Sequence, residues 1–296
     1  MEIVLLHGLV GLAVLLVLWP TRAGATRFLR RWGVPEPTQE QETAAIRYLR
    51  TRRLLYPPLF VLVPAAATAL AGPLHLASPT WGPPYDFAAL IVALLLAETV
   101  VALRPVRGVR VAALTPRRWH DLVPRSAVVL LLALFGTAVV FAVADLTARP
   151  WAQHVATTAE GLSPWYRDEM LRPSGVLVLL GVLLGAVAVF GVVALAVRRA
   201  PIGDPESDAA LRTRSARVVV GIGLGWAGAM ASAANARLST LYGLRFDSPD
   251  TAPAWFAVVP ATGWLGMIVL IVSLGGWMWV ANPAKPAAAP AVAGAV

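Results

Sequence analysis

Residues 175–197 read GVLVLLGVLLGAVAVFGVVALAV and are followed directly by Arg198 and Arg199. The stretch carries no charged side chain, and its length is close to the roughly 20 helical residues that cross a hydrocarbon core of about 30 Å. A helix is stable there because it satisfies its own backbone hydrogen bonds where no water is present. The stretch therefore predicts a membrane-spanning helix that ends at positive charge.

Six further stretches have the same character. With the first one they give seven predicted spans: Glu2 to Trp19, Leu54 to Gly72, Phe87 to Leu103, Ser126 to Asp145, Gly175 to Val197, Val218 to Ala236 and Phe256 to Ala281. Of all residues, 58% are hydrophobic and 14% are charged, whereas about 25% are charged in ordinary soluble domains. The chain is therefore predicted to be an all-α polytopic membrane protein, with one bundle of seven transmembrane helices over residues 1–281.

The basic residues fall in alternate gaps between these spans. The chain has 25 Lys and Arg residues, and those in the other gaps are only Arg149, Arg167, Arg172, Arg237 and Arg245. Because cytoplasmic loops carry the excess of Lys and Arg, the N-terminus is predicted to lie outside and the C-terminus in the cytoplasm.

The formal net charge of +9 is concentrated on that cytoplasmic side. A basic surface beside a bilayer attracts anionic lipid head groups, so the excess does not indicate a nucleic-acid partner. We expect basic residues beside the spans to contact head groups or a soluble cytoplasmic or membrane partner protein. The candidates are Arg50, Arg52, Arg53, Arg117, Arg118, Arg212 and Arg214.

Cysteine is absent, which excludes disulfides, thiolate metal ligands and cysteine nucleophiles. The histidines are scattered and offer no converging set of zinc ligands. We therefore predict no catalytic set, no metal and no cofactor.

The preference for Arg over Lys, together with abundant Ala, is typical of GC-rich genomes. We therefore expect a bacterial plasma membrane. In general style the chain resembles uncharacterised multi-pass membrane proteins of actinobacteria. This resemblance rests on no motif and implies no function.

Two gaps on the cytoplasmic side read as helices that lead into the next span. Acidic residues at the start and basic residues at the end of 38–53 and of 205–217 suit the dipole of a helix. Both segments contain the same tetrapeptide, LRTR, at 49–52 and 211–214.

The matching tetrapeptides allow the chain to be parsed as two parallel repeats. These would be residues 1–103 and 175–281, linked by the helix over 126–145. The layout is similar in topology to the SWEET sugar carriers. Those carriers have a proline motif in each half, and the fifth and sixth spans here contain no proline, so the similarity implies no substrate.

Local signals predict the shorter elements. Asp204 and Ser163 suit the N-cap position of a helix, each with a proline at the first helical position, and the second begins a short outer helix over 163–170. The Ala/Pro tail over 282–296 cannot bury enough apolar surface to order itself and is predicted to be disordered.

Glu98 lies inside the third predicted span, toward its cytoplasmic end. An acid at the membrane centre costs roughly 2.5 to 3.5 kcal/mol, and such groups usually face the bundle interior or a cavity. Two interpretations stay open. Glu98 serves transport, proton or ligand binding, or it pairs with an Arg at the inner end of another span, such as Arg53, Arg125, Arg198 or Arg217.

Other polar residues at the outer ends of spans have structural interpretations. Asp145 and Arg149 have the i, i+4 spacing of a helix-end ion pair. Asn235 and Arg237 close the outer end of the sixth span, where an Arg side chain reaches toward water.

Two G-x-x-x-G pairs lie in the fifth and sixth spans, at Gly181 and Gly185 and at Gly221 and Gly225. Such pairs let helix backbones approach closely. They predict tight packing between these two spans.

No motif specifies a reaction. The leading hypothesis is a non-enzymatic membrane protein, either a small permease or the membrane component of a larger assembly. The alternative is a membrane enzyme acting on a lipid or polyprenyl phosphate at the cytoplasmic face through Arg117, Arg118, His120 and Asp121. It is less favoured because phosphoryl-transfer sites normally contain paired acids or a metal cluster.

Overall fold

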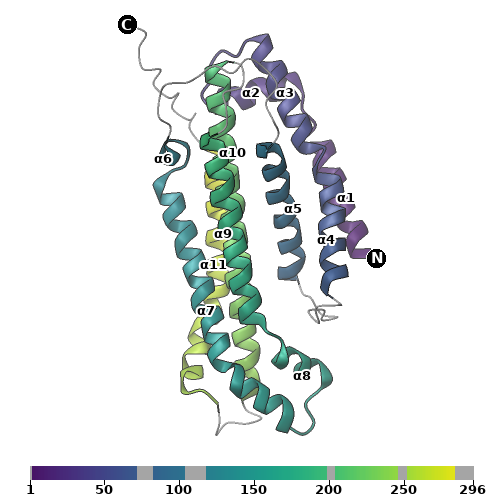
Figure 1. The fold of residues 1–296 in the computed structure, drawn as a ribbon, viewed down its shortest axis with the longest axis vertical. Coiled ribbons are helices and arrows are strands. Elements are labelled where there is room, and N and C mark those ends of the chain that lie inside the picture. Colours follow the sequence, from purple (N-terminus) through teal and green to yellow (C-terminus); the bar gives the residue numbers. More distant parts are fainter. Residues whose placement is uncertain (1, 72–82, 104–117, 199–203, 246–251, 284–296) are drawn as a thin grey trace.

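In the computed structural model, the chain is described for residues 2–71, 83–103, 118–198, 204–245 and 252–283. These residues form helices and no strand (Figure 1). The elements are α1 (Glu2–Val17), α2 (Arg22–Arg31), α3 (Gln39–Arg53), α4 (Tyr56–Ala71), α5 (Pro83–Leu103), α6 (Trp119–Leu122), α7 (Arg125–Thr158), α8 (Pro164–Leu171), α9 (Ser174–Arg198), α10 (Pro205–Leu244), the 3₁₀ helix η3 (Ala254–Val258) and α11 (Val259–Ala281).

Helix α10 is the centre of the bundle. It is 40 residues long, and residues 218–231 are buried without exception. Helices α5, α7, α9 and α11 pack around it, while α1 and α4 pack on the far side of α5 (Figure 1). At 1.5 Å per residue α10 is about 60 Å long, so it extends well beyond a hydrocarbon core of about 30 Å.

The outer surfaces of α1, α7, α9 and α11 are apolar. Large side chains there are exposed, including Leu16, Val129, Leu184 and Trp264. Soluble monomers rarely expose contiguous apolar surface on this scale, whereas lipid-facing helices do. The exposed faces and the apolar helices together indicate a membrane-embedded protein.

The seven predicted apolar stretches all fall on helices, but the helices differ from the prediction in length. Within the described residues, five helices are long and apolar enough to cross a membrane, or six if the bent pair α1 and α2 is one span. The chain turns by 87° between α1 and α2, next to Pro20, which cannot continue a helix. The apolar described part of α5, Ala88–Leu103, is shorter than a full span.

Most local signals gave the elements that were predicted. Thr38 forms a capping box with Gln41 at the start of α3, and α3 and α4 continue as Gln39–Leu70. Ser163 and Asp204 cap α8 and α10. Helix α2 was not predicted, residues 284–296 of the expected tail lie outside the described residues, and the parallel repeat stays a prediction.

One end of the bundle carries a compact group that we call the inner collar: α2, α3 and residues 205–217 of α10. A small apolar core made by Ala25, Leu29, Trp32 and Ala45 includes Ala210 of α10. This core joins the N-terminal helices to the central helix.

Hydrogen bonds close the edge of the inner collar. The Gln41 side chain donates to the Asp204 Oδ2 atom over 2.8 Å, and the Ser207 backbone N–H donates to the same atom over 2.9 Å. Burial favours a higher pKa for Asp204, but these hydrogen bonds outweigh it and hold the pKa below its usual value. The cap is therefore ionised at neutral pH.

Helices α9 and α10 pack closely, but the glycines act differently from the prediction. Trp226 of α10 lies against Gly181 and Gly185 of α9 and donates a 2.8 Å hydrogen bond from its Nε1 atom to the Gly181 carbonyl. Gly221 and Gly225 face Trp277 of α11. These glycines thus provide room for tryptophan rings, which join α10 to two different helices.

We expect Gly185→Ala to lower the free energy of unfolding by about 1–3 kcal/mol, because overpacking displaces neighbouring groups. A Cβ atom at this position would overlap the Trp226 ring, and the ring cannot move without straining its hydrogen bond to Gly181. The measurement is SDS-titrated unfolding in mixed micelles. Gly191→Ala on the same helix is the matched control, since nothing lies within 4 Å of its added Cβ, and it should be neutral or slightly stabilising. Equal stabilities of the two variants would contradict this packing.

Candidate functional site

Glu98 is held in a buried ion pair. It lies on α5, is 2% exposed, and pairs with the Arg52 guanidinium from the end of α3. That guanidinium also lies 5.6 Å from the centroid of the Tyr56 ring. The pair therefore ties the α3–α4 segment to α5 within the apolar part of the bundle.

Arg52 was not among the arginines that the sequence suggested as partners of Glu98, although it directly precedes one of them, Arg53. Two buried charges lose their hydration, and their mutual attraction offsets this loss only while both are present. The arrangement fits the pairing interpretation of Glu98. A transport role would need Arg52 to release the carboxylate.

Two of the other candidate arginines are buried and hold the protein together. Arg212 is 2% exposed, and its Nε atom lies 2.6 Å from the Asp208 carboxylate. It also donates to the carbonyls of Ala196 and Val197 over 3.3 and 3.4 Å, which satisfies the last turn of α9.

Arg214 is buried in the inner collar. It donates a 3.2 Å hydrogen bond to the Tyr48 hydroxyl, and its guanidinium lies over the rings of Tyr48 and Phe28. Arg52, Arg212 and Arg214, which were expected to contact lipid head groups or a partner protein, are thus buried against groups of the protein itself. Their guanidinium groups contact carboxylates, backbone carbonyls and aromatic rings inside the protein.

The remaining candidates have different places. Arg50 is exposed and lies over the Trp19 ring at 5.4 Å, and Arg53 is partly exposed. Arg118 is exposed at the start of α6. Arg117 lies outside the described residues.

A second buried network lies at the opposite end of the bundle, beside α8. The Arg237 guanidinium, from α10, is 3.2 Å from Asp145 of α7 and 3.3 Å from Glu169 of α8, and it donates to the Met170 carbonyl over 3.1 Å. Asp145 also accepts a 2.6 Å hydrogen bond from the Gly175 backbone N–H. Asp145 therefore pairs with Arg237 and not with Arg149, contrary to the prediction.

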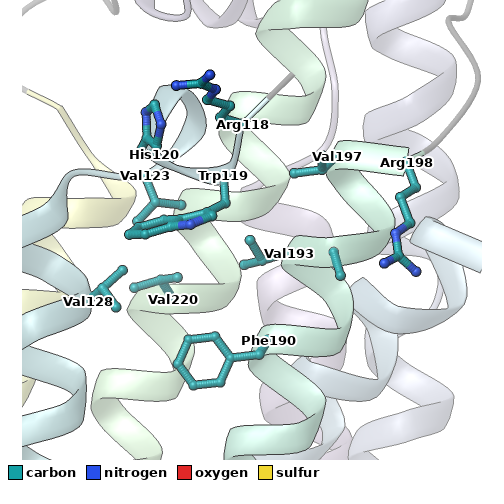
Figure 2. Close-up of a pocket in the computed structure, with 11 residues that line it drawn as sticks. Arg118, Trp119, His120, Val123, Val128, Phe190, Val193, Val197, Arg198 and Val220 are labelled. Atoms are coloured by element: carbon teal, nitrogen blue, oxygen red, sulfur yellow. The ribbon is translucent and has the colours of Figure 1, made fainter. Parts of the chain in front are cut away.

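A pocket of about 650 Å³ lies at the collar end between α6, α7, α9 and α10. Most of the residues that line it are apolar, and the basic ones lie at its rim. The lining residues are Arg118, Trp119, His120, Val123, Val128, Phe190, Val193, Ala194, Val197, Arg198 and Val220. Figure 2 shows Arg118 and His120 together above the Trp119 ring, Phe190 below, and Arg198 on the other side.

The apolar lining follows from helix periodicity. Phe190, Val193 and Val197 are three or four residues apart and therefore share one face of α9. Trp119 and Phe190 are 45% and 39% exposed, so the pocket is open at its side. An apolar chain can enter along these residues while a polar group stays at the rim.

The rim is basic, and the carboxylate of Asp121, next to His120 in the sequence, is already engaged. Asp121 accepts a 3.1 Å hydrogen bond from the Arg118 backbone N–H, and its other oxygen lies 3.0 Å from His120 Nδ1. The carboxylate therefore orients the imidazole. Neither Arg118 nor Arg198 forms an ion pair within the described residues, and Figure 2 shows their guanidinium groups on different sides of the pocket. Arginine binds phosphate and carboxylate groups through paired N–H donors.

Arg118, His120 and Asp121 were identified from the sequence, but the apolar face of α9 that completes the pocket was not. Arg198 was named only as a partner for Glu98, and Phe190 was read as part of an apolar span. The spacing of Phe190, Val193 and Val197 before a terminal Arg was the available signal. That spacing does not indicate which helix this face of α9 would contact.

Comparisons with known proteins add no identification, since no family model, curated protein or solved structure matches the chain. Within the described residues, no group of three or more His, Asp or Glu side chains is placed to hold a metal ion.

Removing one member of the Arg52–Glu98 pair should destabilise the bundle more than removing both. Glu98→Leu leaves a buried, unpaired guanidinium and should lower the free energy of unfolding by about 3–5 kcal/mol. The double variant Arg52→Met/Glu98→Leu should recover most of that loss. SDS-titrated unfolding measures all three, with the exposed Glu160→Leu as the control. A single variant as stable as the natural protein would show that the pair contributes little.

Proposed function

We propose that this protein is a non-enzymatic component of a bacterial plasma membrane that binds an anionic amphiphile in the pocket between α6, α7, α9 and α10. The observation that carries the proposal is the combination of a basic rim at Arg118 and Arg198 with an apolar wall along α9. A free anion needs no such wall, and a neutral lipid tail needs no such rim. Only an amphiphile uses both.

The proposed ligand carries a phosphate at the rim and an apolar chain on the wall. Ligand pockets usually have volumes of about 300–1,000 Å³, so the size suits a head group and the first part of a chain. The open side beside Trp119 and Phe190 allows entry from the surrounding lipid. The protein would act as a small permease for such a molecule or as the membrane component of a larger assembly that recognises it.

The proposed topology places this site in the cytoplasmic leaflet. We infer seven crossings, with the N-terminus outside and the C-terminus inside, and with α1, α4, α5, α7, α9, α10 and α11 as the crossing elements. The distribution of arginine supports this orientation, because Arg118 and Arg198 lie on the basic side.

A membrane enzyme acting on a lipid or polyprenyl phosphate is the second candidate. It is favoured by the contact of 3.0 Å between His120 and Asp121 at the rim, since a carboxylate that orients an imidazole prepares it for proton transfer. We rank it lower because phosphoryl transfer generally uses further acids or metal ions.

The binding proposal is tested with photoactivatable phosphatidic acid added to the full chain in nanodiscs. We expect adducts on α9 near Phe190 and a loss of at least about tenfold in Arg118→Gln/Arg198→Gln, because each charged hydrogen bond contributes about 1.5–3 kcal/mol. Arg149→Gln/Arg167→Gln removes the same charge at the opposite end and should change nothing. Equal labelling by photoactivatable phosphatidylcholine, or unchanged labelling in the first variant, would refute the proposal.

His120→Gln separates the two candidate functions. A binding protein should retain labelling within a few-fold after this change. If the natural protein converts a lipid phosphate and the variant only binds it, the enzyme interpretation replaces the binding interpretation.

The topology is tested with single cysteines, because the natural chain has none. Glu160→Cys, in the turn after α7, should react with a membrane-impermeant maleimide added to intact cells. Glu40→Cys, on α3, should react only with a permeant reagent; both positions are exposed. The reverse pattern of labelling would invert the orientation.

A further inference from the structure

Helix α2 presents a row of exposed arginines. Its sequence is RAGATRFLRR, with no acidic residue. Ala25 and Leu29 are buried against the inner collar, whereas Arg22, Arg27, Arg30 and Arg31 are exposed. Residues separated by three or four positions share a helix face, so Arg27, Arg30 and Arg31 lie together on the side opposite Ala25 and Leu29. Arg22 is exposed at the first residue of the helix.

The place of α2 in the bundle puts this face at the membrane boundary. Helix α1 ends at Val17, and α2 turns away from it by 87°. Between them lies Trp19, which is 44% exposed and is covered by the Arg50 guanidinium. Tryptophan is typical of the head-group region, so α2 begins at that level and runs along the surface of the leaflet.

The inner collar fixes the orientation of α2. Arg214 of α10 lies 5.5 Å from the Phe28 ring centroid, and the Thr26 hydroxyl donates to the Glu42 carboxylate of α3. Trp32 directly follows α2, and its ring centroid lies 5.9 Å from the Arg217 guanidinium of α10. Contacts from α3 and α10 therefore hold one face of α2 and leave its own arginines directed outward.

The exposed arginines have only neutral contacts within the described residues. Arg27 donates to the Ala23 carbonyl over 3.3 Å, and Arg31 lies 3.5 Å from the Asn282 side-chain oxygen. None of the four arginines forms an ion pair in the part of the chain that the structure describes. Among the described residues, their positive charge is therefore not neutralised by an ion pair.

We propose that α2 is an interfacial helix that binds the phosphate groups of anionic phospholipids, such as phosphatidylglycerol, in the leaflet at the collar end. This surface is separate from the amphiphile pocket and does not depend on it. A row of fixed guanidinium groups parallel to the leaflet matches a plane of phosphates. An acidic soluble protein is the competing occupant, but the position of α2 directly after a membrane helix favours lipid.

A cross-linker on the arginine face tests the proposal. Ala23→Cys, at an exposed position between the arginines of α2, gives a single thiol that can carry a benzophenone. The full chain is placed in nanodiscs of phosphatidylcholine with a minority of phosphatidylglycerol, and lipid adducts are counted by mass spectrometry. We expect phosphatidylglycerol to be enriched well above its share of the bilayer.

Charge variants on this background decide the cause of the enrichment. Arg27→Gln/Arg30→Gln/Arg31→Gln should reduce the ratio of phosphatidylglycerol to phosphatidylcholine adducts, because each arginine beside the membrane contributes about 1 kcal/mol, or up to about fivefold in this ratio, at low salt. The corresponding triple lysine variant should retain much of it, and high salt should weaken it in the natural protein by screening. Arg47→Gln, at an exposed position on α3, is the control within the inner collar.

The outcomes separate this proposal from its competitors. No enrichment in the natural protein, or the same enrichment in the glutamine variant, would overturn it, provided that the variant melts like the natural protein. Cross-linking of a soluble acidic protein in place of lipid, after cytosolic extract is added to the nanodiscs, would overturn it in favour of that partner. Arg118→Gln/Arg198→Gln should leave the enrichment unchanged, so failure of the pocket proposal does not affect this result.

Discussion

The packing of four helices around α10 is the constraint on which the rest of the structure depends. A helix surrounded by others can be approached closely only where its side chains are small. Gly221 and Gly225 provide that room for Trp277 of α11, and Gly223 accommodates Val189 of α9. The exchange is reciprocal on the α9 side, where Gly185 provides room for Trp226.

The arginines are divided between two physical tasks. Arg52, Arg212, Arg214 and Arg237 are buried, and each contacts protein groups that replace its lost hydration. Burial of a guanidinium is tolerable only with such partners, so these residues fix the relative positions of helices. The arginines on α2 and at the rim of the pocket are exposed and keep their charge available to other molecules. The same residue type thus has two distinct uses in the structure.

The sequence was sufficient for features that depend on neighbouring residues. Apolar length predicted helices in the right places. The charge pattern of residues 38–53 predicted the start of α3, and Ser163 and Asp204 predicted the starts of α8 and α10. It was insufficient where the partner is remote in the chain. Asp145 lies four residues from Arg149, but the fold brings it to Arg237, 92 residues away.

The candidate site shows the same division. Arg118, His120 and Asp121 are adjacent in the sequence and were identified together. Arg198 and Phe190 belong to a different helix, and only the packing of α9 beside α6 and α7 brings them to the same pocket. Arg52, Arg212 and Arg214 were expected to contact head groups or a partner protein but are buried, for a related reason. A basic residue next to a span can face inward as readily as outward, and charge alone does not decide between them.

Because α10 is one uninterrupted helix, it is also a mechanical connection between the two ends of the bundle. Arg214 lies in the inner collar and Arg237 in the network beside α8, and the 23 positions between them correspond to about 35 Å along the axis. A continuous helix of this kind resists twisting, so its two ends turn together. A rotation of α10 at the collar would therefore shift Arg237 against the Asp145 and Glu169 carboxylates at the other end of the bundle.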